Sequence, residues 1–455
     1  MSQTIEKQAS REVEPFDINS LKETVEFMLQ QAKSKGASAT EAGLSVETGL
    51  SVTVRMGEVE TIEYNRDRSF GLTVYFGQRK GSASTTDFSK QAVIDTVNAA
   101  CDIARYTEED KYSGLADKEK LAFDYPDLDL NHPWDVSAEQ AIEMATQCEA
   151  KSLEHDKRIT NSEGAYITAH QGYRIYANSH GFVGDYSSTR HSNGCTVIAS
   201  EGEGMERDYW YSIARNANQL DDLDMVGEMA AKRALKRLNA QKVKTQKVPV
   251  VFHAEVARGL LGHLVRALGG GAQYRRASFL VDKLGEKIFP DRIHIDERPH
   301  LKQATGSAPF DGEGVINSAH DLIKDGVIQS YVLDTYSARR LDSVTTGNSG
   351  GMHNLFINTD DYDLDGLLKE MGTGILVTEV MGQGVNIVTG DYSRGGTGFW
   401  VENGEIQYPI EEFTLASNLA GMYQRLALIG NDVDLRSSLC TGSWLIDEMT
   451  IAGAE

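Results

Sequence analysis

The sequence predicts an α+β fold of two domains, each with a mainly antiparallel or mixed β-sheet flanked by helices. Strand-like and helix-like segments come in blocks and do not alternate one by one, which argues against a doubly wound parallel sheet. The chain has 455 residues, more than the roughly 250–300 residues that one hydrophobic core usually serves. Its 43 glycines and 8 prolines fit many tight turns between strands.

The composition is that of an acidic globular protein. Hydrophobic residues make up 40% and charged residues 25% of the chain, so it can form a core without help. Its formal net charge of −22 repels phosphate backbones and anionic lipids, and we expect no direct nucleic-acid or membrane partner. No apolar run approaches the roughly 18 residues of a membrane span, and the first residues lack the apolar core of a signal peptide.

The cysteines indicate a reducing compartment. They stand at positions 101, 148, 195 and 440, and no two are close enough for a C-x-x-C metal or redox motif. Scattered cysteines in a chain without a signal sequence are typical of reduced thiols. We therefore expect a cytoplasmic protein.

Four helices are predicted in the N-terminal half, because apolar residues recur there on one face at helical spacing. They lie near residues 21–35, 89–105, 137–154 and 222–239. Gly36 ends the first helix. Ser137 begins the third, and Gln140 three residues later completes the pattern of a capping box. Residues 1–16, ahead of the first helix, are predicted to form a loose polar tail.

Between these helices the apolar period changes to two, which is typical of half-buried strands. The alternation predicts strands at residues 50–56 and 70–76. Further strand-like runs lie between residues 159 and 213, with a turn at His180-Gly181. These runs favour an antiparallel sheet for the N-terminal half.

A short basic and polar stretch, residues 241–247, separates the two halves of the chain. We place the domain boundary there, with an N-terminal domain at 1–240 and a C-terminal domain at 241–455. The second half is richer in glycine turns. Within it, Asn403-Gly404 stands between two strand-like runs and predicts a β-hairpin.

Two short matches to functional motifs are better interpreted as turns. Gly347 to Gly351 copies the G-x-S-x-G nucleophile elbow, but that elbow requires a following helix, and residues 352–357 read as a strand. Asp361 to Gly366 copies the first half of a calcium loop, whose twelfth position must be a glutamate and here is Gly372. We interpret the second match as an acidic turn that caps a helix.

The segment from Phe252 to His263 holds two histidines and a glutamate, the residue types of a zinc site. At about 100° per residue, His253 and Glu255 would lie about 200° apart on a helix. His263 lies about 15 Å farther along the helix axis. These side chains cannot ligate one ion as helical neighbours, so this segment alone does not predict a zinc site.

The same segment, together with four glycine-rich strings, resembles the TldD/PmbA family of metalloproteases. The strings lie at residues 372–374, 381–384, 390–395 and 398–406. The resemblance runs over nearly the whole chain from about residue 20, and it is greatest to the PmbA, or TldE, branch of the family. It implies cytosolic proteins that act in pairs in proteolysis, namely maturation of a microcin-type peptide and degradation of an antitoxin.

In this family the TldD-type chain carries zinc on a helical H-E-x-x-x-H motif, with a further cysteine ligand near the C-terminus. Carried over onto this sequence, the motif places His253 at the first histidine, Ala254 at the glutamate and Arg258 at the second histidine. A methyl group cannot act as a base, and a guanidinium cannot bind a cation. Cys440 matches the cysteine region only loosely, and we assign it no role.

The resemblance therefore implies a chain with no catalytic or metal-binding residues and no cofactor of its own. Zinc is expected in a TldD-type catalytic subunit, the predicted partner, and peptides are the predicted substrates. Isolated, the chain is expected to be a homodimer or a monomer.

The glycine-flanked run Tyr392-Ser393-Arg394 is our candidate for substrate binding, because glycine lets a peptide backbone approach closely. The alternative is that these residues only shape a turn. Two other functions also stay open: an autonomous peptidase with an unrecognised site, and a non-proteolytic protein that binds and regulates DNA gyrase. The net charge argues against contact with DNA but not against contact with a basic protein.

Overall fold

The computed structural model describes residues 17–453, so the predicted tail at 1–16 lies outside the described residues. Within that range it contains one six-stranded, one five-stranded and one seven-stranded sheet, with helices packed against them. The prediction of an α+β fold with mainly antiparallel or mixed sheets is confirmed. All strands of the six-stranded sheet come from residues 39–214, and those of the other two come from residues 241–452.

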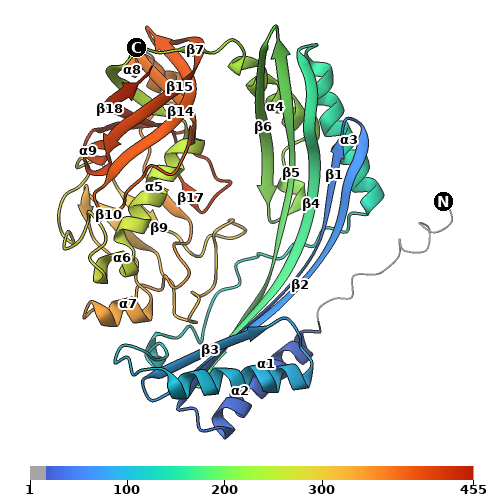
Figure 1. Cartoon of the computed structure of the whole chain (residues 1–455), viewed down its shortest axis with the longest axis vertical. Coiled ribbons are helices and arrows are strands. Elements are labelled where there is room, and N and C mark those ends of the chain that lie inside the picture. The colour runs from blue at the N-terminus through green and yellow to red at the C-terminus, as the bar shows by residue number, and fades with distance from the viewer. Residues whose placement is uncertain (1–16, 454–455) are drawn as a thin grey trace, which may run out of the picture.

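The N-terminal sheet is a long, curved antiparallel ribbon that faces the C-terminal part of the chain (Figure 1). Its strands, in the spatial order β3-β2-β1-β4-β5-β6, are β1 (Ala39–Arg55), β2 (Glu58–Phe76), β3 (Arg79–Thr85), β4 (Ile159–Asn178), β5 (Val183–Glu201) and β6 (Gly204–Ala214). The strands predicted at 50–56 and 70–76 fall largely within β1 and β2. Both are longer than the alternation indicated, at 17 and 19 residues.

Helices from four segments cover one face of this sheet, and they confirm the four predicted helices within a few residues. They are α1 (Ile18–Ser34), α2 (Lys90–Tyr106), α3 (Ala138–His155) and α4 (Leu223–Arg237). The capping box of Ser137 and Gln140 is present at the start of α3. Helices α1 and α2 form one core with the sheet, and α3 and α4 form a second.

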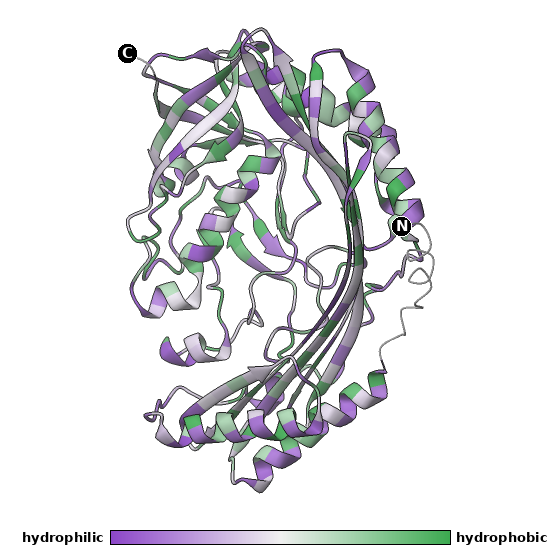
Figure 2. Ribbon diagram, turned by 45° about the vertical axis from the view of Figure 1, so that its right-hand side comes forward, coloured by the Kyte–Doolittle hydropathy of each residue, from purple (hydrophilic) through white to green (hydrophobic). Residues whose placement is uncertain are grey.

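Alternation along β1 decides which face the helices cover. Every even-numbered residue from Ala42 to Val54 except Thr48 is a buried apolar residue packed in one of these two cores. The odd-numbered residues Ser45, Glu47, Gly49 and Ser51 point to the opposite face. Figure 2 shows this second face on the inside of the curve, toward the C-terminal part. The concave face is therefore polar.

The C-terminal part is built on a seven-stranded sheet with the order β16-β18-β8-β13-β14-β15-β7. An additional pairing of β15 with β18 closes the sheet on itself. Its strands are β7 (Gln241–Lys242), β8 (Gln246–Phe252), β13 (Gly374–Met381), β14 (Asp391–Glu402), β15 (Glu405–Asn418), β16 (Leu426–Ile429) and β18 (Trp444–Ala452). The predicted hairpin at Asn403-Gly404 joins β14 to β15, and both turn residues have positive φ angles of 52° and 78°.

The smaller sheet has the order β11-β10-β9-β12-β17. Its strands are β9 (Ile295–Glu297), β10 (His320–Lys324), β11 (Val327–Ile328), β12 (Leu355–Ile357) and β17 (Leu439–Cys440). The G-x-S-x-G string is a turn, as predicted: Gly347, Gly350 and Gly351 have positive φ, and strand β12 follows. The acidic string is a cap, as predicted, since the Asp363 carboxylate accepts from the Gly366 amide at the start of helix α8.

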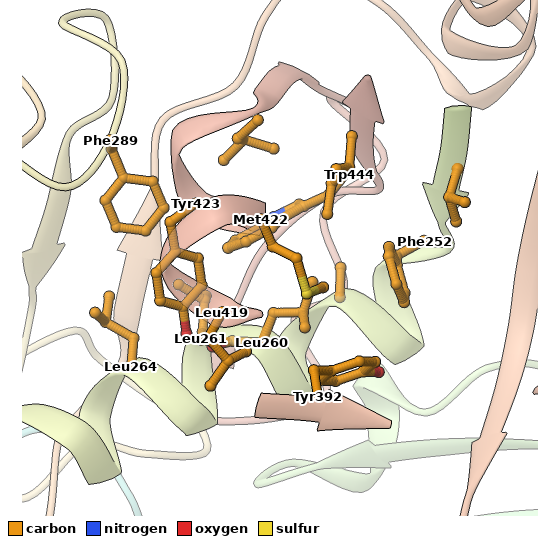
Figure 3. Packing of buried hydrophobic residues seen from close by; sticks show 14 of the residues in the cluster. Phe252, Leu260, Leu261, Leu264, Phe289, Tyr392, Leu419, Met422, Tyr423 and Trp444 are labelled. Atoms are coloured by element: carbon orange, nitrogen blue, oxygen red, sulfur yellow. Dashed lines mark hydrogen bonds between the residues drawn. The ribbon is translucent and has the colours of Figure 1, made fainter. Parts of the chain in front are cut away.

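Among the described residues, five helices complete this part: α5 (Ala254–Leu268), α6 (Gly270–Tyr274), α7 (Thr335–Arg340), α8 (Leu364–Met371) and α9 (Leu419–Gln424). The largest core lies where α5 and α9 meet the seven-stranded sheet (Figure 3). Tyr423 is fully buried there, and its hydroxyl donates to the carbonyl of Leu260 at 2.9 Å. This core fixes α5 in place. No helix within residues 17–453 is long and apolar enough to cross a bilayer.

Candidate functional site

Helix α5 begins where strand β8 ends, and His253 is the residue at which the chain turns from one into the other. The imidazole Nδ1 of His253 accepts the amide of Glu255 at 3.4 Å and so caps the helix. Leu260, Leu261 and Leu264 face the core. The opposite side of α5 faces a cleft of about 520 Å³ between the C-terminal part and strand β6.

The three residues at the metal-motif positions lie at the start of α5 as the sequence order requires, but each makes contacts other than those of a metal site. Ala254 is 2% exposed, and its amide donates to the Ser443 hydroxyl at 3.0 Å. Burial lowers the pKa of His253. The Arg258 guanidinium lies 3.5 Å from both the Asp434 carboxylate and the Tyr211 hydroxyl. The Arg258 side chain therefore contacts Asp434 and Tyr211.

Glu255, one residue after Ala254, is the centre of a network of charges. Its carboxylate contacts Arg233 of α4 at 2.8 Å and Arg436 at 2.6 Å. Burial alone would raise the pKa of Glu255, but the charges of Arg233 and Arg436 outweigh it, and the pKa is lowered. Arg436 also pairs with Asp434 at 2.9 Å.

The network ties the two halves of the chain together. Arg233 pairs with Asp208 of β6 at 3.1 Å, and Arg237 pairs with Glu379 of β13 at 2.7 Å. The Arg436 guanidinium lies 4.3 Å from the ring centroid of Trp210, which also belongs to β6. Sequence reasoning missed these residues, because they come from four separate segments and none follows a local motif.

The residues around α5 do not fit a zinc ion. A TldD-type site needs two helical histidines and a cysteine thiolate, whereas here Arg258 holds a permanent positive charge at the second histidine position. Burial raises the pKa of Cys440 to about 12, and its thiol contacts the Ser437 carbonyl at 3.3 Å. Within residues 17–453, no group of three or more His, Cys, Asp or Glu side chains is placed to hold a metal.

The structure separates the three residues of the candidate substrate-binding run. Arg394 lines the cleft, as do Arg258 and His263 of α5. Ser393 is exposed, and its amide donates to the Gly384 carbonyl at 2.6 Å. Tyr392 is 2% exposed and packs against the rings of Phe252 and His263. Tyr392 therefore belongs to the core and not to the cleft.

A second hollow, of about 360 Å³, lies on the concave face of the six-stranded sheet. His170 lies flat on Gly49 there, where a Cβ atom would come within 2.4 Å of its ring. Its Nε2 lies 3.3 Å from the Ser51 hydroxyl, and its Nδ1 lies 3.2 Å from the Glu47 carboxylate. The second contact is not aligned as a hydrogen bond. Ser51 and His170 are thus placed as a nucleophile and its base would be, with Glu47 close to the base but not hydrogen-bonded to it.

The sequence matches the PmbA/TldA metallopeptidase family in three segments: domain 1 at residues 40–104, the central domain at 131–238 and the C-terminal domain at 245–453. The chain belongs to the TldD/PmbA metallopeptidase family. The resemblance seen in the glycine-rich strings is thereby confirmed.

Named relatives lie in both branches of the family. Metalloprotease PmbA of Escherichia coli O157:H7 is 51% identical over 95% of this chain and 96% of its own length. The PmbA homolog of Haemophilus influenzae is 46% identical over 95% and 96%. The TldD homolog of the same organism is 22% identical over 87% of this chain and 89% of its own length.

Solved structures share the fold over at least 95% of this chain. A Bacteroides thetaiotaomicron protein, described as a proposed modulator of DNA gyrase, superimposes with a TM-score of 0.91 at 30% identity, covering 96% of this chain and 99% of its own. TldE from Thermococcus kodakarensis superimposes with a TM-score of 0.82 at 19% identity, covering 95% and 100%. The second likeness concerns the fold alone.

Proposed function

We propose that this chain is the non-catalytic subunit of a two-chain cytoplasmic metalloprotease. Its partner is a TldD-type chain that carries the zinc. The proposal rests on the residues that occupy the metal-motif positions on α5. Ala254 cannot act as a base, and Arg258, a cation paired with Asp434, stands where a metal ligand would be. Such a chain keeps the family scaffold and uses it for structure and for guiding substrate.

The cleft beside α5 is the place where we propose that a peptide passes. It is lined from both halves of the chain by arginines and carboxylates, which can hydrogen-bond to the main chain of an extended peptide without selecting its side chains. Burial and the charges of Arg266 and Arg394 lower the pKa of His263 to about 4, so this ring is neutral at pH 7. Unfolded peptides, including microcin-type precursors and antitoxins, are the proposed substrates.

The test is reconstitution from separately purified chains. This chain alone should cleave no peptide and bind no stoichiometric zinc. Mixed with a TldD-type chain, it should form a hetero-oligomer that cleaves unfolded peptides, and a chelator should abolish the cleavage. Chelator-sensitive cleavage by this chain alone, with contaminating partner excluded by mass spectrometry, would refute the proposal. Failure to form a complex would count against it as well.

The placement of Ser51, His170 and Glu47 favours a second candidate function, an autonomous serine-type peptidase or esterase. Ser51 and His170 are within hydrogen-bonding distance, as a nucleophile and its base must be. If this function holds, a fluorophosphonate reagent should label Ser51, and Ser51→Ala should abolish hydrolysis that a chelator leaves intact. No labelling of the native chain would remove the candidate.

A third candidate, a regulator that binds DNA gyrase, rests on the description of the Bacteroides neighbour at 30% identity. A pull-down of gyrase by the isolated chain distinguishes it. The metalloprotease proposal expects gyrase to stay unbound, whereas a regulator would retain it in the absence of any TldD-type chain.

A further inference from the structure

Two arginines, Arg190 and Arg215, lie next to each other on the concave side of the six-stranded sheet. Among residues 17–453, neither Arg190 nor Arg215 forms an ion pair. Arg215 is held by the carbonyls of Thr189 and Thr305. Burial lowers the pKa of Arg215, and the nearby charge of Arg190 lowers it further. In a chain of net charge −22, this is a local excess of positive charge.

Arg190 borders the hollow on the concave face, and the rest of that hollow is rich in hydroxyl groups. Thr168 and Ser192 hydrogen-bond to each other at 2.6 Å in the hollow, and Tyr166 and Tyr211 also line it. Hydroxyl groups and guanidinium groups both donate hydrogen bonds to oxygen anions. The chemistry of this lining therefore suits an anionic oxygen ligand.

Glycines shape the hollow by letting two rings lie flat against the sheet. A Cβ atom at Gly49 would lie 2.4 Å from the His170 ring, and one at Gly194 would lie 2.6 Å from the Tyr166 ring. Since both rings are held down, space remains above them for a ligand. The only carboxylate among the lining residues is Glu47, and it lies 3.2 Å from His170.

The hollow adjoins the cleft beside α5, because a residue that lines one contacts a residue that lines the other. Tyr211 lines the hollow, and its hydroxyl lies 3.5 Å from Arg258, which lines the cleft. On the proposed function, a peptide in the cleft would pass this contact to reach the hollow that Arg190 borders. A guanidinium matches the fork of a carboxylate, which it can bind through two parallel hydrogen bonds.

We infer that the hollow around Arg190 binds a carboxylate group of the peptide substrate. This inference rests on the proposed function and specifies its substrate: peptides with a free C-terminus or an acidic side chain at the matching distance. The C-terminal carboxylate and the side chains of Asp and Glu share this chemistry, and the experiment distinguishes them.

The test is isothermal titration of the isolated full-length chain with four forms of one unfolded peptide. The forms carry a free or amidated C-terminus, each with either Glu or Gln at one internal position. Because Arg190 is exposed, we expect about a tenfold loss of affinity when the recognised carboxylate is removed, near the lower limit for a charge-assisted hydrogen bond. The peptide form that binds more weakly than the parent peptide identifies which carboxylate the hollow recognises.

Arg190→Gln should abolish the preference, giving all four forms equal affinity, without changing the thermal unfolding of the chain. The matched control is Arg66→Gln, an exposed arginine of the same sheet outside the hollow, which should keep the preference. A wild-type chain that binds no form, or all four equally, would overturn the inference, and so would a preference that survives Arg190→Gln. The assay requires no TldD-type chain, so a failure to form the complex would be seen separately.

Discussion

Glu255→Gln tests whether the charge network around α5 holds the two halves of the chain together. Glu255 is buried, with only 9% of its side chain exposed, and it bridges Arg233 and Arg436. Glutamine keeps the shape of the side chain but removes its charge. Both arginines then lose a partner and retain one acid each, Asp208 and Asp434.

The expected cost follows from the burial of the pairs. Removing one partner of a buried ion pair destabilises proteins by about 3–5 kcal/mol, and the two remaining acids place the change near the lower value, about 3 kcal/mol. For a domain of 150–250 residues, this corresponds to a fall in the melting temperature of about 6–12 °C. The C-terminal family domain, residues 245–453, falls in that size range.

Differential scanning calorimetry of the whole chain measures this change. The matched control is Glu228→Gln on α4, which removes a carboxylate that is 36% exposed and paired with Lys232 and Lys151 and should leave the melting temperature unchanged. The reasoning is refuted if Glu255→Gln melts within about 1 °C of the wild type, or if Glu228→Gln lowers the melting temperature as much.

The same structure supports four further predictions. The fold lowers the pKa of Glu255, so the stability that its charge contributes is present above the unfolded pKa of about 4.3 and is lost as the pH falls through the folded pKa. The melting temperature of Glu255→Gln should therefore fall less steeply with decreasing pH than that of the wild type. Elemental analysis should find no stoichiometric zinc in the purified chain, and the double variant Ala254→Glu, Arg258→His should gain no peptidase activity, because the groups that orient metal ligands are missing. The four buried thiols, among them Cys440, should react with a thiol reagent only after denaturation. We propose domains at 1–240 and 241–455, and brief trypsin digestion should cut first at Lys244, which is exposed.

The spacing of apolar residues in the sequence predicted the helices and strands that bury one face. The helices at α1 to α4 were found from their apolar spacing, and the Asn403-Gly404 hairpin from the need for two positive φ angles. The strands were predicted too short for a physical reason. Residues 58–69 of β2 are nearly all exposed, so they carry no apolar alternation, and only their pairing with β1 keeps them extended.

The candidate site could be predicted only where it coincides with a local motif. The metal-motif positions His253, Ala254 and Arg258 were assigned from the family resemblance, and the structure places them at the start of α5. The partners of Arg258 and Glu255 could not be predicted, because Asp434 and Arg436 come from about 180 residues farther along the chain. Tyr392 and Arg394 stand two residues apart, yet one is buried and the other lines the cleft.

The charge network explains how α5 is held in place without a metal. Its buried face is fixed by the core around Tyr423 and Leu260, which needs no metal. Its other face would expose a cleft between two halves of an acidic chain, where like charges repel. Pairing with Arg233, Arg258 and Arg436 compensates the charges of Glu255 and Asp434 and links that face to β6 and α4. The substitution Arg258→His alone would therefore remove a cation that pairs with Asp434 without completing a metal site.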